Sequence, residues 1–238
     1  MSQTRFPADR RSVLIGLGAA ALLPGCMTGP FEAPRVGEPE IPGPPDRPRL
    51  SVDSAFASPR EMYGERIDDD FVLPAIPYRQ IDPRFLRQLV TDPTGEKPGT
   101  IIVDTANRFL YLVRPGGEAI RYGVGIGREG FAWSGRAVIQ WKKKWPTWTP
   151  PAEMIKRDPE LEKYSAANGG MPPGLANPLG ARALYIFKDG VDTLYRLHGS
   201  PEWSSIGKAV SSGCVRLINQ DVIDLYERSP NKTPIVVM

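Results

Sequence analysis

The sequence predicts a mostly β domain, and three observations support that fold class. Short runs rich in β-branched and aromatic residues recur along the chain from residue 99 onward, turn residues separate them, and only one amphipathic helix follows, near the C-terminus. The length of 238 residues allows one or two domains. The expected strands cover residues 101–104, 109–113, 122–127, 137–141, 183–187, 193–197 and 235–237.

The first 26 residues predict an export signal. Arg10 and Arg11 precede an apolar run, 12–23, that is too short to span a membrane. The paired arginines resemble a twin-arginine signal, although an ordinary secretory signal is equally compatible. The residues from Leu23 to Cys26 resemble a bacterial lipobox. We therefore expect Cys26 to be lipidated and the protein to be a periplasmic, membrane-anchored lipoprotein.

The segments that follow differ sharply in composition. Residues 27–75 are rich in proline and lack apolar periodicity, which predicts an extended linker. Residues 76–98 predict a lead-in segment, including a short amphipathic helix over 82–90. The main domain is expected to cover residues 99–238.

Several features of the main domain bear on its function. The glycines of 123–127 lack the βαβ context of a nucleotide-binding loop. The net charge of +3 is too small to indicate a nucleic-acid partner. Residues 142–144 are three lysines and predict a solvated strand face, and the neighbouring Trp145 and Trp148 either contact substrate or pack in the core. Asn219 is expected to cap a helix over 220–228.

The candidate catalytic residues are His198 and Cys214. His198 is the only histidine, and Cys214, 16 positions later (214 − 198), is one of two cysteines. A thiol needs a nearby base to become a nucleophile at neutral pH, and imidazole suits that role. Gly213 permits a tight turn, and the amides around it could stabilise an oxyanion. The alternative is a buried structural cysteine beside an incidental histidine. One histidine and two distant cysteines cannot build a zinc site, and we expect no cofactor or metal.

The residues around this pair resemble the L,D-transpeptidase (YkuD-type) catalytic domain. The similarity rests on HGS at 198–200, SSGCVRL at 211–217 and NPLG at 177–180, and extends from about Pro98 to the C-terminus. It implies a β-sandwich with a short helix after the catalytic cysteine. The roles it implies are nucleophile for Cys214, base for His198, a carbonyl that orients the imidazole for Gly199, oxyanion support for Gly213 and Ser212, and substrate binding for Arg216, Trp203 and Trp148. Ser212 stands where many members of the family have histidine.

The resemblance also implies an activity. The thiolate of Cys214 would attack the carbonyl of the third residue in a peptidoglycan tetrapeptide stem, release D-alanine and pass the acyl group to an amine. That amine would belong to a second stem or to a wall-anchored protein. Carbapenems, which acylate enzymes of this family, would react with Cys214. The alternatives are an L,D-carboxypeptidase, a cysteine peptidase of another fold acting on wall peptides, and a non-catalytic wall-binding lipoprotein. Papain-like peptidases place cysteine before histidine, opposite to this chain.

Overall fold

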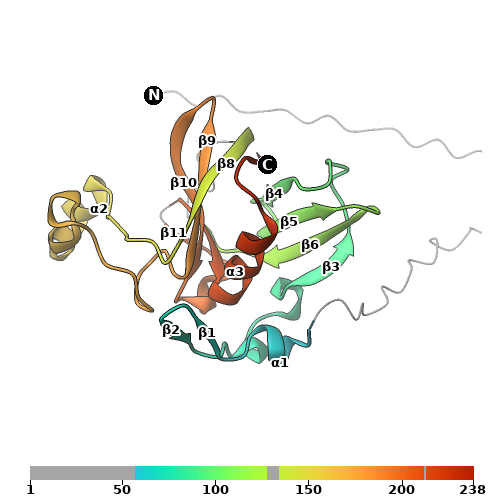
Figure 1. Ribbon diagram of the computed structural model, residues 1–238, viewed down its shortest axis with the longest axis horizontal. Coiled ribbons are helices and arrows are strands. Elements are labelled where there is room, and N and C mark those ends of the chain that lie inside the picture. Colours follow the sequence, from blue (N-terminus) through green and yellow to red (C-terminus); the bar gives the residue numbers. More distant parts are fainter. Residues whose placement is uncertain (1–56, 128–133, 212) are drawn as a thin grey trace, which may run out of the picture. The chain divides into compact units, whose positions relative to one another are not determined.

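A nine-stranded mixed sheet forms the body of the part of the chain that the structure describes (Figure 1). The structure is a computed structural model that describes residues 57–127, 134–211 and 213–238, without the side chains of 210 and 211. These residues belong to one unit of the chain, Pro48–Met238. The expected export signal, residues 1–26 with Cys26, and the first part of the expected linker lie outside the described residues.

The elements run in the following order. Before the main domain come α1 (Pro59–Met62), β1 (Arg66–Asp68), β2 (Phe71–Leu73), the 3₁₀ helices η1 (Tyr78–Gln80) and η2 (Pro83–Phe85), and β3 (Gln88–Thr91). The first half of the main domain has β4 (Ile101–Asp104), β5 (Phe109–Arg114), β6 (Glu118–Gly123), β7 (Ile126–Gly127) and β8 (Gly135–Lys144). The second half has α2 (Ala152–Arg157), η3 (Pro159–Tyr164), η4 (Ala166–Asn168), β9 (Arg182–Lys188), β10 (Val191–Ser200), η5 (Trp203–Ser205), β11 (Ala209–Ser211), β12 (Val215–Ile218), α3 (Asn219–Arg228) and β13 (Thr233–Val237).

The order of strands in the large sheet is β12-β10-β9-β8-β13-β4-β5-β6-β3. Two neighbouring pairs, β10 with β12 and β13 with β4, are parallel, and the other neighbours are antiparallel. Two small sheets pair β1 with β2 and β7 with β11. The mostly β fold class that the sequence predicts is confirmed. In the described part of the chain, no helix is long and apolar enough to cross a membrane.

One hydrophobic core joins the two halves of the sheet. Residues of β4, β5 and β6 share a buried cluster with residues of β9, β10 and β12, and Val222 and Leu225 of α3 complete it. Figure 1 shows α3 beside both groups of strands. Because inward side chains alternate with outward ones along a strand, the buried Leu184 and Leu197 fix which residues of β9 and β10 face outward.

The segment before β4 differs from what the sequence predicts. The end of the expected linker, 59–73, forms α1 and the β1–β2 hairpin, because Tyr63 and Leu73 are fully buried against the rest of the fold. The expected amphipathic helix over 82–90 is wrong. Instead, η2 ends at Phe85, and β3 covers the free edge of β6, so that strand pairing outweighs the helical periodicity.

Buried polar contacts fasten this segment to the main domain. Asp68 of β1 accepts two hydrogen bonds from Arg182 of β9, at 2.7 and 2.8 Å, and a third from Nε1 of Trp145 at 2.9 Å. Arg87 lies 2.8 Å from Asp224 and 3.7 Å from Asp221, both on α3. The end of the expected linker and the lead-in segment are therefore part of the fold that holds β9 and α3.

The structure corrects the expectation for Lys142 in the main domain and decides between the two alternatives for Trp145. Lys142 does not lie on a solvated strand face, because its Nζ donates to the carbonyls of Tyr226 and Ser229, where a cation is favoured at the C-terminal end of α3. Trp145 is 7% exposed and its ring lies 4.0 Å from that of Phe71, so it packs in the core.

Candidate active site

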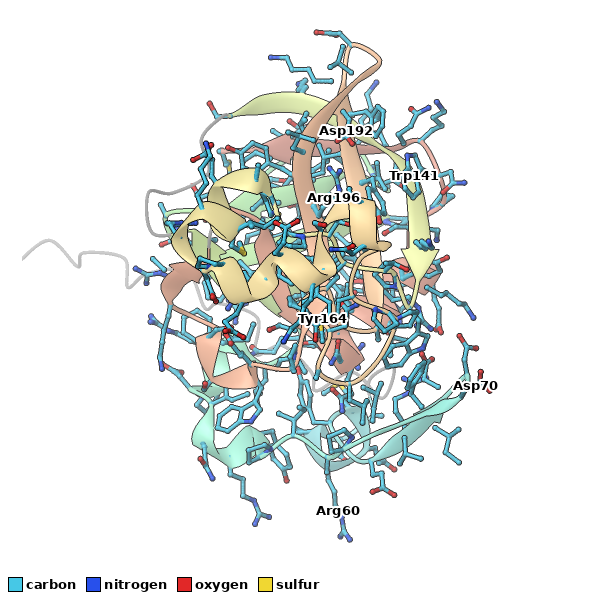
Figure 2. The ribbon with its side chains drawn as sticks, turned by 90° about the vertical axis from the view of Figure 1, so that its left-hand side faces the viewer. Arg60, Asp70, Trp141, Tyr164, Asp192 and Arg196 are labelled. Carbon is cyan, nitrogen blue, oxygen red and sulfur yellow. The ribbon has the colours of Figure 1, made fainter. Side chains whose placement is uncertain are left out.

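His198 lies on the outer face of the β8-β9-β10-β12 part of the sheet. In β10, Leu197 points into the core, so His198 points to the opposite side. The register places His198 beside Ala183 of β9 and Arg216 of β12. The segment that carries α2 projects from this side of the sheet in Figure 1 and lies in front of it in Figure 2.

The imidazole of His198 is held by backbone. Its Nδ1 lies 2.6 Å from the carbonyl oxygen of Gly199. Because a carbonyl only accepts hydrogen bonds, Nδ1 carries the proton and Nε2 is left as the basic nitrogen. Burial lowers the pKa of His198 to about 4, a shift that the Gly199 and Pro178 carbonyls oppose and the charge of Arg216 increases. The imidazole is therefore neutral at pH 7 and able to accept a proton.

Two buried asparagines shape the backbone around the histidine. Asn219 accepts a hydrogen bond from the amide of Ala181 at 2.9 Å, and a Cβ added at Gly199 would lie 2.2 Å from its Oδ1. The expectation that Asn219 caps α3 is therefore wrong: the helix begins after Ile218 without a side-chain cap. Asn177 is fully buried and donates to the carbonyls of Pro146, Met171 and Pro172.

Cys214 directly precedes β12, whose Val215 pairs with Leu197 of β10. The parallel register thus brings Cys214 alongside the residues of β10 that precede His198. Burial raises the pKa of the Cys214 thiol, whereas a hydrogen bond with the Arg196 backbone and the charges of Arg196 and Arg216 lower it. The thiol and the imidazole are both neutral at rest, so a proton must move from sulfur when the thiol attacks.

The other residues predicted for the site contact different parts of the fold. Gly213 has a φ of 132°, in the region that favours glycine, and so the turn before Cys214 requires it. Ser212 lies outside the described residues. Arg216 forms an ion pair with Glu202, with Nη1 and Oε2 2.6 Å apart.

The two tryptophans that the resemblance assigns to substrate binding are half-buried. Trp203 packs against a cluster that includes Ile206 and Phe85, and Trp148 pairs through its backbone with Met171.

The sequence did not indicate the roles that three residues have in this region: Asn177, Asn219 and Arg196. Asn177 belongs to the NPLG motif, which the sequence identified only as a family block. Arg196 precedes His198 by two positions on the outer face of β10, and it gave no signal in the sequence because its place beside the Tyr185 ring depends on strand pairing. Asn219 was noticed, but for a helix cap.

Comparison with known proteins decides the family. The model of the L,D-transpeptidase catalytic domain (YkuD) matches residues 98–237, more than half of the chain. The chain belongs to the L,D-transpeptidase catalytic domain family. This result agrees with the resemblance that the motifs at 177–180, 198–200 and 211–217 indicate.

Named relatives of this L,D-transpeptidase family member are similar over part of their length. "Probable L,D-transpeptidase YbiS" of Escherichia coli K12 is 34% identical over 157 residues, which are 63% of this chain and 47% of that protein. "Probable L,D-transpeptidase ErfK/SrfK" of the same strain is 31% identical over 159 residues, 64% of this chain and 47% of that protein. The chain thus spans about half the length of the curated relatives it matches.

Among solved structures, one from Brucella melitensis is 45% identical and covers 68% of this chain and 99% of its own. It is titled a probable carnitine operon oxidoreductase, and the TM-score is 0.46. A likeness at that TM-score carries no conclusion about the activity of this chain.

Proposed function

We propose that the protein is a peptidoglycan L,D-transpeptidase in which Cys214 is the nucleophile and His198 its base. The observation that carries this proposal is the hydrogen bond between Nδ1 of His198 and the Gly199 carbonyl, which leaves Nε2 basic on the strand that lies beside Cys214. Membership of the family gives the reaction class. A buried structural cysteine beside an incidental histidine would not need this arrangement.

The proposed reaction has two steps. The Cys214 thiol gives its proton to Nε2 of His198, and its sulfur attacks the carbonyl carbon of the third residue of a tetrapeptide stem. The peptide bond to D-alanine breaks, the imidazolium returns the proton to the leaving amine, and a thioester remains. An amine of a second stem, or of a wall-anchored protein, then attacks the thioester. It gives a proton to Nε2 of His198, the carbon–sulfur bond breaks, and the imidazolium returns that proton to the sulfur, which frees the thiol. Backbone amides at Gly213 and Cys214 stabilise the oxyanion of both steps.

The experiment that tests this function follows the products by mass spectrometry. The purified protein is incubated with disaccharide tetrapeptide, and a Cys214→Ala preparation serves as the blank. Release of D-alanine together with a cross-linked dimer supports the transpeptidase. Release of D-alanine with only the shortened tripeptide would instead identify an L,D-carboxypeptidase, in which water is the acceptor. No release by the wild-type protein would contradict both activities and favour a non-catalytic wall-binding role.

The depressed pKa of His198 gives the first prediction. We expect the rate of Cys214 acylation by a carbapenem to stay nearly constant from pH 7 to pH 5 and to fall by half near pH 4. His198 has a pKa of about 4, and only the neutral imidazole can accept the thiol proton. Circular dichroism at each pH serves as the control for folding. A midpoint near 6.5, the ordinary value for histidine, would show that the imidazole is not desolvated.

The second prediction concerns location. We propose that the protein is held at a membrane through lipidated Cys26, with its catalytic domain in the periplasm and residues between them as a spacer. The Cys26→Ser variant should then move from the membrane fraction to a soluble or uncleaved form, as judged by fractionation and immunoblotting. A wild-type protein that is already soluble would contradict the lipid anchor and favour an ordinary signal peptidase site.

A further inference from the structure

Arg196 lies on the outer face of β10 and has no role in the reaction proposed above. It precedes His198 by two positions, so both side chains leave the strand on the same side. The register pairs Arg196 with Tyr185 of β9, and Tyr185 with Trp141 of β8. Figure 2 shows Arg196, Asp192 and Trp141 near one another on these strands. Arg196, Tyr185 and Trp141 form one row across the face that carries His198, and Asp192 lies beside the row on β10.

The contacts along this row fix the guanidinium in place. Two hydrogen bonds, at 2.7 and 2.8 Å, join it to both carboxylate oxygens of Asp192, and Nη1 also donates to the Tyr195 carbonyl at 2.9 Å. Its Cζ lies 4.4 Å from the centre of the Tyr185 ring, and that ring stacks on Trp141 with 3.6 Å between centroids. The Arg196 side chain is only 14% exposed. An arginine that makes a bidentate ion pair and stacks on an aromatic ring has little conformational freedom, so its charge stays in one place.

Arg216 is held quite differently. It lies on β12 beside His198, but its partner Glu202 has a side chain that is 65% exposed, and the pair is joined through a single guanidinium nitrogen. An incoming carboxylate could replace Glu202 at little cost, because exposed ion pairs contribute little to stability. The register places Cys214 beside Arg196 and His198 beside Arg216, and the charges of both arginines lower the pKa of the thiol and of the imidazole. Asp192 and Glu202 are the carboxylates paired with them.

We propose that Arg196 is a positioning residue whose fixed guanidinium stabilises the thiolate of Cys214 as the proton leaves for His198, and that Arg216 is left to bind substrate. This proposal rests on the proposed function for its role in turnover. The stabilisation itself concerns only the thiol, so it can be measured without a peptidoglycan substrate. Asp192, Tyr185 and Trp141 serve as the support that keeps the charge in place.

The test measures the rate at which iodoacetamide alkylates Cys214 between pH 6 and pH 10. In Arg196→Gln, the rate at pH 7 should fall about tenfold, the consequence of a one-unit rise in the thiol pKa, and the difference from wild type should narrow as the pH rises into the range where the thiol ionises. Arg196→Lys keeps the charge but cannot make the bidentate and stacked contacts, so its rate at pH 7 should lie between those of wild type and Arg196→Gln. The matched control is Arg136→Gln, which removes the same charge from an exposed arginine of β8 and should leave the profile unchanged.

Two results would overturn the proposal: an Arg196→Gln profile that superimposes on wild type, or a loss of rate that is equal at every pH, which would indicate a merely structural role. If Arg196→Gln fails to fold in a thermal unfolding assay, Arg196→Met keeps the apolar stem against Tyr185 without the charge and takes its place. Iodoacetamide needs no transfer activity. A wild-type protein that releases no D-alanine would therefore contradict the proposed function and leave the alkylation result to decide on Arg196.

Discussion

His198→Ala is expected to slow acylation of Cys214 by a carbapenem about 10²-fold or more, and Cys214→Ala to abolish the mass increase altogether. The loss for His198→Ala is the usual scale for removing a general base. It should be large here because burial raises the pKa of the thiol, so few thiolates form without the imidazole. Mass spectrometry of the intact protein over time gives both rates. An adduct on Cys214→Ala would remove Cys214 from its proposed role.

The matched control for this prediction is Glu202→Gln. In Ser-His-Asp enzymes a carboxylate orients the histidine, and Glu202 is the acid nearest to this motif in sequence. In the structure, Glu202 pairs with Arg216, whereas Nδ1 of His198 meets the Gly199 carbonyl. A backbone carbonyl survives side-chain mutation, so Glu202→Gln should keep most of the acylation rate. A loss comparable with that of His198→Ala would mean that a carboxylate, not a carbonyl, anchors the imidazole.

Local patterns in the sequence were sufficient for much of the fold. The strands β4, β5, β9 and β10 could be predicted because each is a short run rich in β-branched and aromatic residues that is bounded by turn residues. The fold class followed from their number, and the family from motifs around His198 and Cys214. The pairing of β13 between β4 and β8, in the middle of the sheet, had no local signal, since it depends on contacts between segments separated by at least 89 positions (β13 starts at 233 and β8 ends at 144).

Long-range contacts also explain the residues that sequence reasoning misassigned or missed. Asn219 has the sequence position of a helix cap, but its side-chain oxygen accepts a hydrogen bond from the amide of Ala181, 38 residues away. Lys142 belongs to a run of three lysines that looks solvated, and only the folded position of α3 gives it two carbonyl partners. Arg196 acquires its place from Tyr185 on the neighbouring strand. For Asn219 and Lys142 the decisive partner is distant in sequence, so no local pattern could identify it. Arg196 has a partner four positions away in Asp192, but strand pairing supplies the Tyr185 ring.

The other large effect is expected for Asp68, in a segment that precedes the matched family domain. Asp68→Ala should lower the free energy of unfolding by about 3–5 kcal/mol, the cost of leaving a buried charge unpaired. The Arg182 side chain is 1% exposed and the Asp68 side chain 8%, and both carboxylate oxygens bind the guanidinium. Urea unfolding with linear extrapolation gives the value. The matched control is Glu96→Gln, which breaks the pair with the exposed Arg136 and should cost about 1 kcal/mol or less.

A double variant distinguishes the part of the lost unfolding free energy that comes from the unpaired charge from the part that comes from lost packing. Replacing Asp68 by leucine and Arg182 by methionine removes both charges, and should recover much of the stability lost in Asp68→Ala, because an apolar pair of similar volume avoids the desolvation cost. Arg182 begins β9 directly after Ala181, whose amide binds Asn219 beside Gly199. Asp68→Ala should therefore also slow acylation of Cys214. An unfolding free energy of Asp68→Ala within about 1 kcal/mol of wild type would show that the β1–β2 hairpin does not hold β9, the strand that borders the active site.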